Sequence, residues 1–93
     1  MVVGILTAEF YIGGADSLKA KRRVLKSLIE RMRSKYNIAI AEVASQDIWQ
    51  RATIGVTCVS SSARHANSIL SSVINDLDKD GEAVLLDYSI EIV

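Results

Sequence analysis

Six segments of regular hydrophobic pattern follow one another along this chain, and their order constrains the fold more than any other feature. Residues 2–12 are rich in β-forming side chains and predict a strand, whereas residues 18–34 place apolar side chains at helical spacing. Residues 37–44 form a short apolar run, and residues 51–60 alternate apolar and polar side chains. Both of these segments predict strands, joined by a short connection.

The second half of the chain continues with a helix and a strand. Apolar residues step by three and four from Ala63 to Leu77, and residues 84–92 alternate again. The order strand, helix, strand, strand, helix, strand predicts an α+β, ferredoxin-like βαββαβ fold, with a four-stranded antiparallel sheet and two helices on one face. We expect residues 1–93 to form a single ferredoxin-like domain, because this length suits one modest core.

This topology brings two unusual stretches to the same end of the sheet. The pair Gly13-Gly14 separates the first strand from the first helix, where Asp16 or Ser17 can cap the helix. The hairpin SQDIWQ, residues 45–50, joins the second strand to the third. We expect the loop of residues 78–82 to return to that end as well, so a functional site is best sought there.

Composition limits the kinds of chemistry that the chain can perform. Cys58 and His65 are the only cysteine and histidine, so no Cys-His or Ser-His-Asp set can be assembled and no metal cluster is expected. We expect Cys58, in an apolar run, to be a small buried hydrophobe. The sequence therefore predicts no enzyme, no catalytic residue, no metal and no cofactor.

Hydropathy gives no sign of a membrane or secreted protein. No apolar run reaches membrane-spanning length, and the Met-Val-Val-Gly start lacks the basic-then-apolar order of a signal peptide. We expect a cytoplasmic location and no membrane partner.

Charge is divided unevenly along a chain whose net charge is zero. Residues 17–36 carry eight cations and a single acid, Glu30, whereas the rest of the chain carries three cations and ten acids. One segment therefore carries most of the positive charge of the chain, which favours a negatively charged partner such as RNA. The eight cations are Lys19, Lys21, Arg22, Arg23, Lys26, Arg31, Arg33 and Lys35.

Four of these cations lie in the first two turns of the predicted helix. The positive end of the helix dipole disfavours cations there by up to about 1 kcal/mol each, so something other than helix stability favours them. At about 100° per residue Lys21 falls within the apolar stripe of the helix. Either the side-chain stems cover apolar surface while the charges reach solvent, or the cations face an anion. The candidate nucleic-acid or anion-binding residues are Lys19, Lys21, Arg22, Arg23, Lys26 and Arg51.

The SQDIWQ hairpin holds the only tryptophan, Trp49, at a position where a turn is expected. Its ring either folds over the end of the sheet as a lid, with Gln46 and Gln50 bonding hairpin backbone groups, or contacts a second subunit or an RNA base. Asp47 is explained as a turn residue or as an ion-pair partner of a nearby cation, Lys21 or Arg51. We take Gln46, Asp47, Trp49 and Gln50 as interface or turn residues.

Two predicted surfaces favour a homodimer. The strand of residues 37–44 is an edge in this topology and carries no Pro or Lys to block pairing. The uncovered sheet face is also expected to be partly apolar, with Val3, Ile5 and either Leu85 or Val59 on it. A second copy of the chain would cover either surface.

The stretches SLKAKRRVLKSL and QDIWQRA complete the sequence evidence. With these motifs the chain resembles the YlxP-like family of small bacterial proteins, a domain-of-unknown-function family, over nearly its whole length. The resemblance implies the ferredoxin-like fold. It also implies a ribosome- or RNA-linked role, because genes of this family neighbour genes for translation initiation and ribosome maturation.

Two function classes follow from these observations. The first is an RNA- or ribosome-associated accessory factor that binds RNA or a ribosomal subunit through the basic first helix and the hairpin Gln46–Arg51. The alternative is a homo-oligomeric module that binds a small anionic ligand. A phosphate-processing enzyme at the Gly13-Gly14 turn ranks last, because no general base is present beside it.

Overall fold

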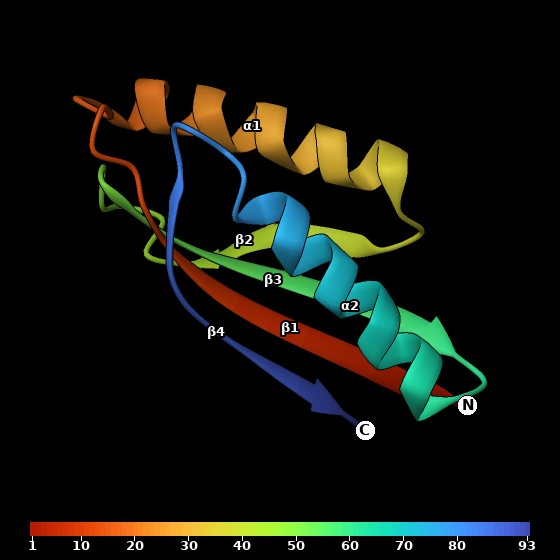
Figure 1. The fold of residues 1–93 in the computed structure, drawn as a ribbon. Coiled ribbons are helices and arrows are strands. Elements are labelled where there is room, and N and C mark those ends of the chain that lie inside the picture. Colours follow the sequence, from red (N-terminus) through yellow and green to blue (C-terminus); the bar gives the residue numbers. More distant parts are fainter.

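The computed structural model describes all 93 residues and has the predicted ferredoxin-like topology (Figure 1). Two helices cover one face of a single four-stranded antiparallel sheet, whose strands lie in the order β2-β3-β1-β4. Neither helix is long and apolar enough to cross a membrane. The elements are β1 (Val2–Tyr11), α1 (Leu18–Lys35), β2 (Ala39–Ala44), β3 (Arg51–Ser60), α2 (Ala63–Leu77) and β4 (Val84–Ile92).

Serine side chains begin both helices. Ser17, rather than its neighbour Asp16, caps α1 by accepting a 3.0 Å hydrogen bond from the backbone N–H of Ala20. Ser62 caps α2 in the same way, through the N–H of His65 at 3.0 Å. These caps satisfy free N–H groups of each first turn, so the local sequence determines where the helices start.

The core lies between the helices and the inner sheet face and is mostly aliphatic. Leu6, Phe10 and Ile54 are fully buried, and Cys58 is buried among them as expected. α2 packs directly on β1 at Gly4, where an added Cβ would lie 2.8 Å from a methyl carbon of Leu70. The absence of a side chain at Gly4 therefore sets how closely α2 packs on the sheet.

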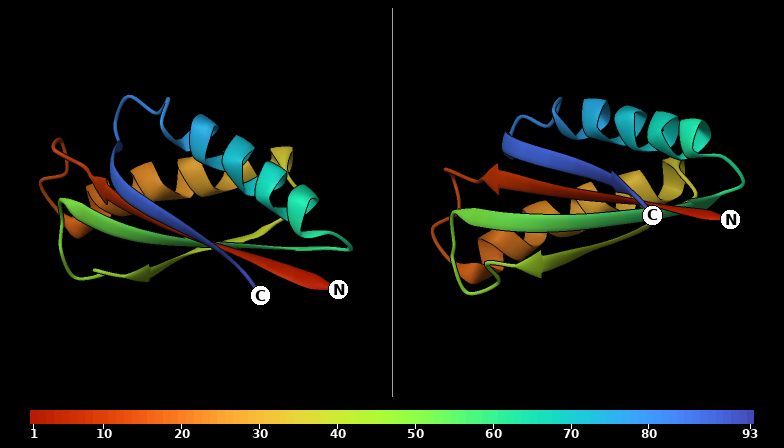
Figure 2. Two further views of the ribbon diagram at one scale, coloured as in Figure 1. Left: turned by 60° about the horizontal axis from the view of Figure 1, so that its bottom comes forward. Right: turned by 90° about the horizontal axis from the view of Figure 1, so that it is seen from below.

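The sheet face opposite the helices is uncovered (Figure 2). Val3 lies opposite Val59 on that face, and Ile5 is beside them, as expected. Of the two alternatives predicted beside them, Val59 lies on this face and Leu85 does not, because a register shift places Leu85 opposite Phe10, on the helix side. The shift is a β-bulge, and it inverts the alternation of side chains at the start of β4.

Candidate functional site

The turn after β1 and the β2–β3 hairpin meet at one end of the sheet, as their order along the chain predicts. The backbone N–H of Ile12 donates to the carbonyl of Gln50 at 2.9 Å. The side-chain amide of Gln50 donates in turn to the carbonyl of Gly13 at 3.1 Å. These two bonds hold the hairpin beside the residues that lead into α1.

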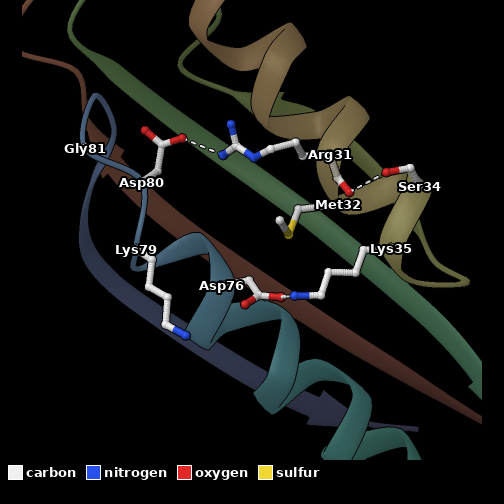
Figure 3. Close-up of a pocket in the computed structure, with 8 residues that line it drawn as sticks. All are labelled: Arg31, Met32, Ser34, Lys35, Asp76, Lys79, Asp80 and Gly81. Carbon is white, nitrogen blue, oxygen red and sulfur yellow. Dashed lines mark hydrogen bonds and ion pairs between the residues drawn. The ribbon is translucent and has the colours of Figure 1, made fainter.

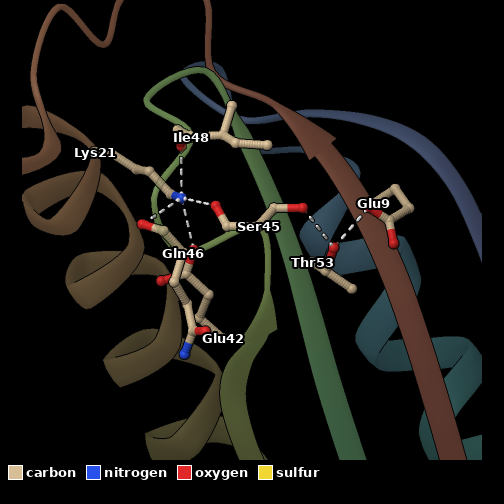
Figure 4. A network of polar contacts seen from close by, with 7 residues as sticks. All are labelled: Glu9, Lys21, Glu42, Ser45, Gln46, Ile48 and Thr53. Carbon is tan, nitrogen blue, oxygen red and sulfur yellow. Dashed lines mark hydrogen bonds and ion pairs between the residues drawn. The ribbon is translucent and has the colours of Figure 1, made fainter.

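Lys21 ties α1 to the same hairpin (Figure 4). Its ammonium group is 2.7 Å from the carbonyl oxygens of Ser45 and Ile48 and 2.7 Å from a carboxylate oxygen of Glu42. The side chain is 1% exposed. The assignment of Lys21 to an anion-binding surface therefore needs correction, because its charge is enclosed and its partners belong to the protein.

Lys21 forms its ion pair with Glu42. The sequence had suggested Asp47 as the partner, because Asp47 lies in the hairpin. Glu42 lies on β2 opposite Ile54, and so points to the helix side of the sheet. A buried ammonium is costly unless its hydrogen bonds and charge are satisfied. Here the hairpin carbonyls accept hydrogen bonds from the ammonium group, and the Glu42 carboxylate balances its charge. The same contacts hold the hairpin against α1.

The hairpin is held from the open face of the sheet as well. Thr53 is buried there and donates a 2.8 Å hydrogen bond to a carboxylate oxygen of Glu9. The hydroxyl of Ser45 lies 3.4 Å from that of Thr53 (Figure 4). Ser45 is the only non-glycine residue with a positive φ, 62°, a left-handed conformation that costs about 1–2 kcal/mol. The contacts on both sides of the sheet therefore maintain a strained turn.

Four cations of the first half of α1 are exposed and make no ion pair with the rest of the chain. The three ion pairs of the structure use other cations: Lys21, Arg31 and Lys35. At about 100° per residue the four exposed side chains fall within one stripe roughly 100° wide, opposite the buried side of the helix. They are Lys19, Arg22, Arg23 and Lys26.

The second half of α1 differs, because its cations are used within the structure (Figure 3). Arg31 pairs with Asp80, and Lys35 pairs with Asp76, at 2.7 and 2.8 Å. Arg33 donates to the carbonyl of Ile40 at 3.3 Å. The unpaired positive charge of α1 therefore lies mainly in the half next to the hairpin, and Arg33 is the one exposed cation of the second half that makes no ion pair.

The ion pairs at this end of the helices change the pKa values of their members. The Lys35 ammonium and the Tyr36 hydroxyl, which both donate hydrogen bonds to Asp76, lower the pKa of that carboxyl. The same carboxylate raises the pKa of Lys35 and of Tyr36. Each shift favours the paired form of the group, and the cluster joins the end of α1 to α2.

The hairpin tip exposes large apolar side chains. Ile48 and Trp49 are 51% and 52% exposed, so the ring of Trp49 does not close over the sheet end as a lid. Arg51 is exposed at the start of β3, opposite Tyr11 on the open sheet face. Gln46, Asp47 and Gln50 are exposed as well.

Tyr11 lies between the hairpin end of the sheet and Arg23 of α1, because it lines the same hollow as Arg23. Its ring packs on Gly13, where an added Cβ would lie 2.8 Å from a ring carbon. The hollow that Tyr11 lines is open, measures about 480 Å³ and reaches the loop after α2, as expected for residues 78–82. The hollow is lined in part by Tyr11, Gly13, Gly14, Arg23, Gly81 and Glu82.

The sequence did not single out Glu42 or Tyr11 as members of this site. Glu42 is the only acid on β2 and lies two residues after the buried Ile40, so both side chains point to the same face of the sheet. An acid on the buried face of a strand is a sequence pattern that can indicate a buried ion pair. Tyr11 carried no comparable signal, because only the fold places it beside the hairpin.

The comparisons with known proteins support the fold and identify relatives. Residues 3–90 match the family described as protein of unknown function (DUF503). A Bacillus subtilis (strain 168) protein described as uncharacterized protein YlxP is 39% identical over 77 residues, which cover 83% of this chain and 84% of that protein.

A solved structure of a de novo designed protein with a ferredoxin fold is similar in shape. Its TM-score is 0.54 at 15% sequence identity, and the similarity covers 98% of this chain and 85% of the designed chain. At that identity the similarity concerns the fold alone. The family match and the Bacillus relative place the chain by sequence: it belongs to the DUF503 family, which contains YlxP-like proteins.

Proposed function

We propose that this protein is a cytoplasmic RNA- or ribosome-associated accessory factor that binds RNA phosphates through the first half of α1, next to the β2–β3 hairpin. One observation carries the proposal: Lys19, Arg22, Arg23 and Lys26 form one exposed stripe without internal partners. Arg51 extends the positive charge to the hairpin.

The position of the stripe supports an external anion. A cation in the first turn of a helix, such as Lys19, opposes the helix dipole, and none of the four cations gains a compensating ion pair within the protein. At about 1.5 Å per residue the stripe spans roughly 10 Å, which suits a chain of phosphates better than one small anion. A polyanion is therefore the partner class that this surface fits best.

The test is the binding of fluorescently labelled ribosomal RNA, followed by anisotropy at increasing salt. Four phosphate contacts predict that the logarithm of the association constant falls with the logarithm of salt concentration with a slope of about −3 to −4. The variant Arg22→Glu/Lys26→Glu should lose most of this affinity. Its matched control, Arg64→Glu/Lys79→Glu, changes the net charge equally on surfaces outside the stripe and should bind nearly as wild type.

Two results would contradict the proposal. One is an absence of binding at low salt, and the other is equal loss of affinity in the two charge-reversed variants, which would indicate an effect of net charge alone. Co-sedimentation with separated ribosomal subunits then distinguishes a ribosomal partner from free RNA, because only a ribosomal partner carries the protein into the pellet.

A second candidate function is a homo-oligomeric module that binds a small anionic ligand. The hollow beside Gly13 and Gly14 favours it, because Arg23 lines that hollow and makes no ion pair. The exposed Val59 opposite Val3 gives the open sheet face an apolar patch for a second copy. This function predicts a dimer by light scattering and a rise in melting temperature with a nucleotide or inorganic phosphate, without binding of RNA.

A further inference from the structure

The β2–β3 hairpin presents Trp49 on a fixed support. Lys21 holds the carbonyls of Ser45 and Ile48, on either side of the tip, and Gln50 is bonded to Ile12 and Gly13. The side chain of Trp49 is nevertheless 52% exposed. A large aromatic ring on a fixed loop loses little conformational entropy when a ligand binds, which makes it an efficient contact surface.

Tyr11 is a second exposed ring on the neighbouring segment. It is 41% exposed and packs on Gly13, the residue whose carbonyl accepts the hydrogen bond of Gln50. Gln50 therefore joins the segment that carries Trp49 to the segment that carries Tyr11. Two half-exposed rings are fixed at one end of the sheet.

The cations beside Tyr11 indicate which ligand this end of the sheet fits. Arg23 lines the same hollow as Tyr11, and Arg51 lies opposite Tyr11 on the sheet. Aromatic rings next to cations are the arrangement by which proteins hold single-stranded nucleic acid, with bases on the rings and phosphates on the cations. In duplex RNA the bases are stacked on one another and are closed to such rings.

We infer that Trp49 and Tyr11 form a stacking platform for unpaired bases, so that the protein binds single-stranded segments of RNA in preference to duplex. The inference rests on the proposed function and narrows its substrate class. Phosphate contacts alone would favour the duplex, in which the linear charge density is about twice that of one strand. A preference for single strands therefore requires contacts to the bases.

The experiment compares a short mixed-sequence RNA strand with the same strand annealed to its complement. Both are titrated by anisotropy, while the emission of Trp49, the only tryptophan, reports stacking on its ring. We expect tighter binding of the single strand, with quenching of Trp49 emission. Trp49→Ala and Tyr11→Ala should each weaken single-strand binding by roughly five-fold or more and leave duplex binding nearly unchanged.

Trp49→Phe is the matched variant, because it retains a ring and should keep part of the affinity. Circular dichroism confirms that each variant is folded. Equal affinity for the two RNAs, with unchanged emission and no effect of Trp49→Ala, would overturn the inference and leave phosphate binding intact. Binding of neither RNA at low salt would overturn the proposed function and the inference with it. A wild-type dimer that becomes monomeric in Trp49→Ala would also overturn the inference, since the ring would then contact a second copy.

Discussion

The ammonium group of Lys21 donates a 2.7 Å hydrogen bond to the carbonyl oxygen of Ile48, the residue before the exposed Trp49. Through this bond a buried residue of α1 supports the tip of the β2–β3 hairpin. Since Lys21 follows Lys19 and precedes Arg22, one turn of α1 supplies both the support for the hairpin and two exposed cations. The position of the hairpin and the position of the basic stripe are thus set by the same few residues.

We expect Lys21→Met to destabilise the protein strongly. The substitution retains most of the apolar stem but removes the donor that the Glu42 carboxylate and the carbonyl oxygens of Ser45, Gln46 and Ile48 share. Removing one member of a buried ion pair costs about 3–5 kcal/mol, and the partial exposure of Glu42 places this case at the lower end. Urea unfolding followed by circular dichroism measures the loss.

Two further variants identify the cause of that loss. Lys19→Met changes an exposed cation of the same helix turn and should alter the free energy of unfolding by less than about 0.5 kcal/mol. Lys21→Met/Glu42→Gln should be more stable than Lys21→Met, because it removes the unpaired charge. If the double variant is as unstable as the single one, the lost hydrogen bonds to the carbonyls dominate and the ion pair contributes little.

Ser45 gives a prediction about the strained turn. Glycine adopts a positive φ without the steric cost that a Cβ imposes, so Ser45→Gly should be more stable than Ser45→Ala by about 1 kcal/mol. Both variants lose the hydroxyl, so the comparison isolates the backbone. Equal midpoints in urea would mean that the turn relaxes from this conformation when its side-chain contacts are removed.

Asp76 predicts how stability depends on pH. Its hydrogen bonds from Lys35 and Tyr36 lower the pKa of the carboxyl below the ordinary value of 3.8. A lowered pKa in the folded state stabilises the protein above the unfolded pKa, and this contribution is lost as pH falls through the folded value. We therefore expect Asp76→Asn to reduce the melting temperature at neutral pH.

The difference between wild type and Asp76→Asn should shrink as pH falls below 3.8. Asp78→Asn is a suitable control, because Asp78 is exposed at the end of α2 and makes no ion pair. Melting curves at about pH 7 and about pH 2.5 provide the comparison. A constant difference between the two proteins at both pH values would show that protonation of Asp76 is not its cause.

The fold was predictable because each element has its own local signal. The helical spacing of Leu25, Leu28 and Met32 and the alternation of residues 51–60 require no knowledge of distant residues. The face of the sheet on which Leu85 lies was not predictable from such a local pattern. It depends on a bulge in β4 opposite Glu9 and Phe10, which is a property of strand pairing and leaves no periodic signal in one strand.

The site was predictable only in part, for a similar reason. The position of Lys21 within the apolar stripe indicated that its charge needed an unusual environment. The nature of that environment depends on Glu42 and the hairpin carbonyls, which are more than twenty residues away along the chain. The separation of free from paired cations on α1 likewise depends on Asp76 and Asp80, which lie beyond α1 in another part of the chain.

Packing of α2 on β1 gives the last prediction. A Cβ at Gly4 would lie 2.8 Å from the Leu70 methyl carbon and 3.0 Å from the Cys58 sulfur, so Gly4→Ala should force α2 outward. Overpacking of this kind costs about 1–3 kcal/mol. Leu70→Val shortens the side chain that meets the new methyl, so it should destabilise the wild type more than it destabilises Gly4→Ala. Urea unfolding of all four proteins measures this coupling, and additive effects would mean that the contact between Gly4 and Leu70 does not set the position of the helix.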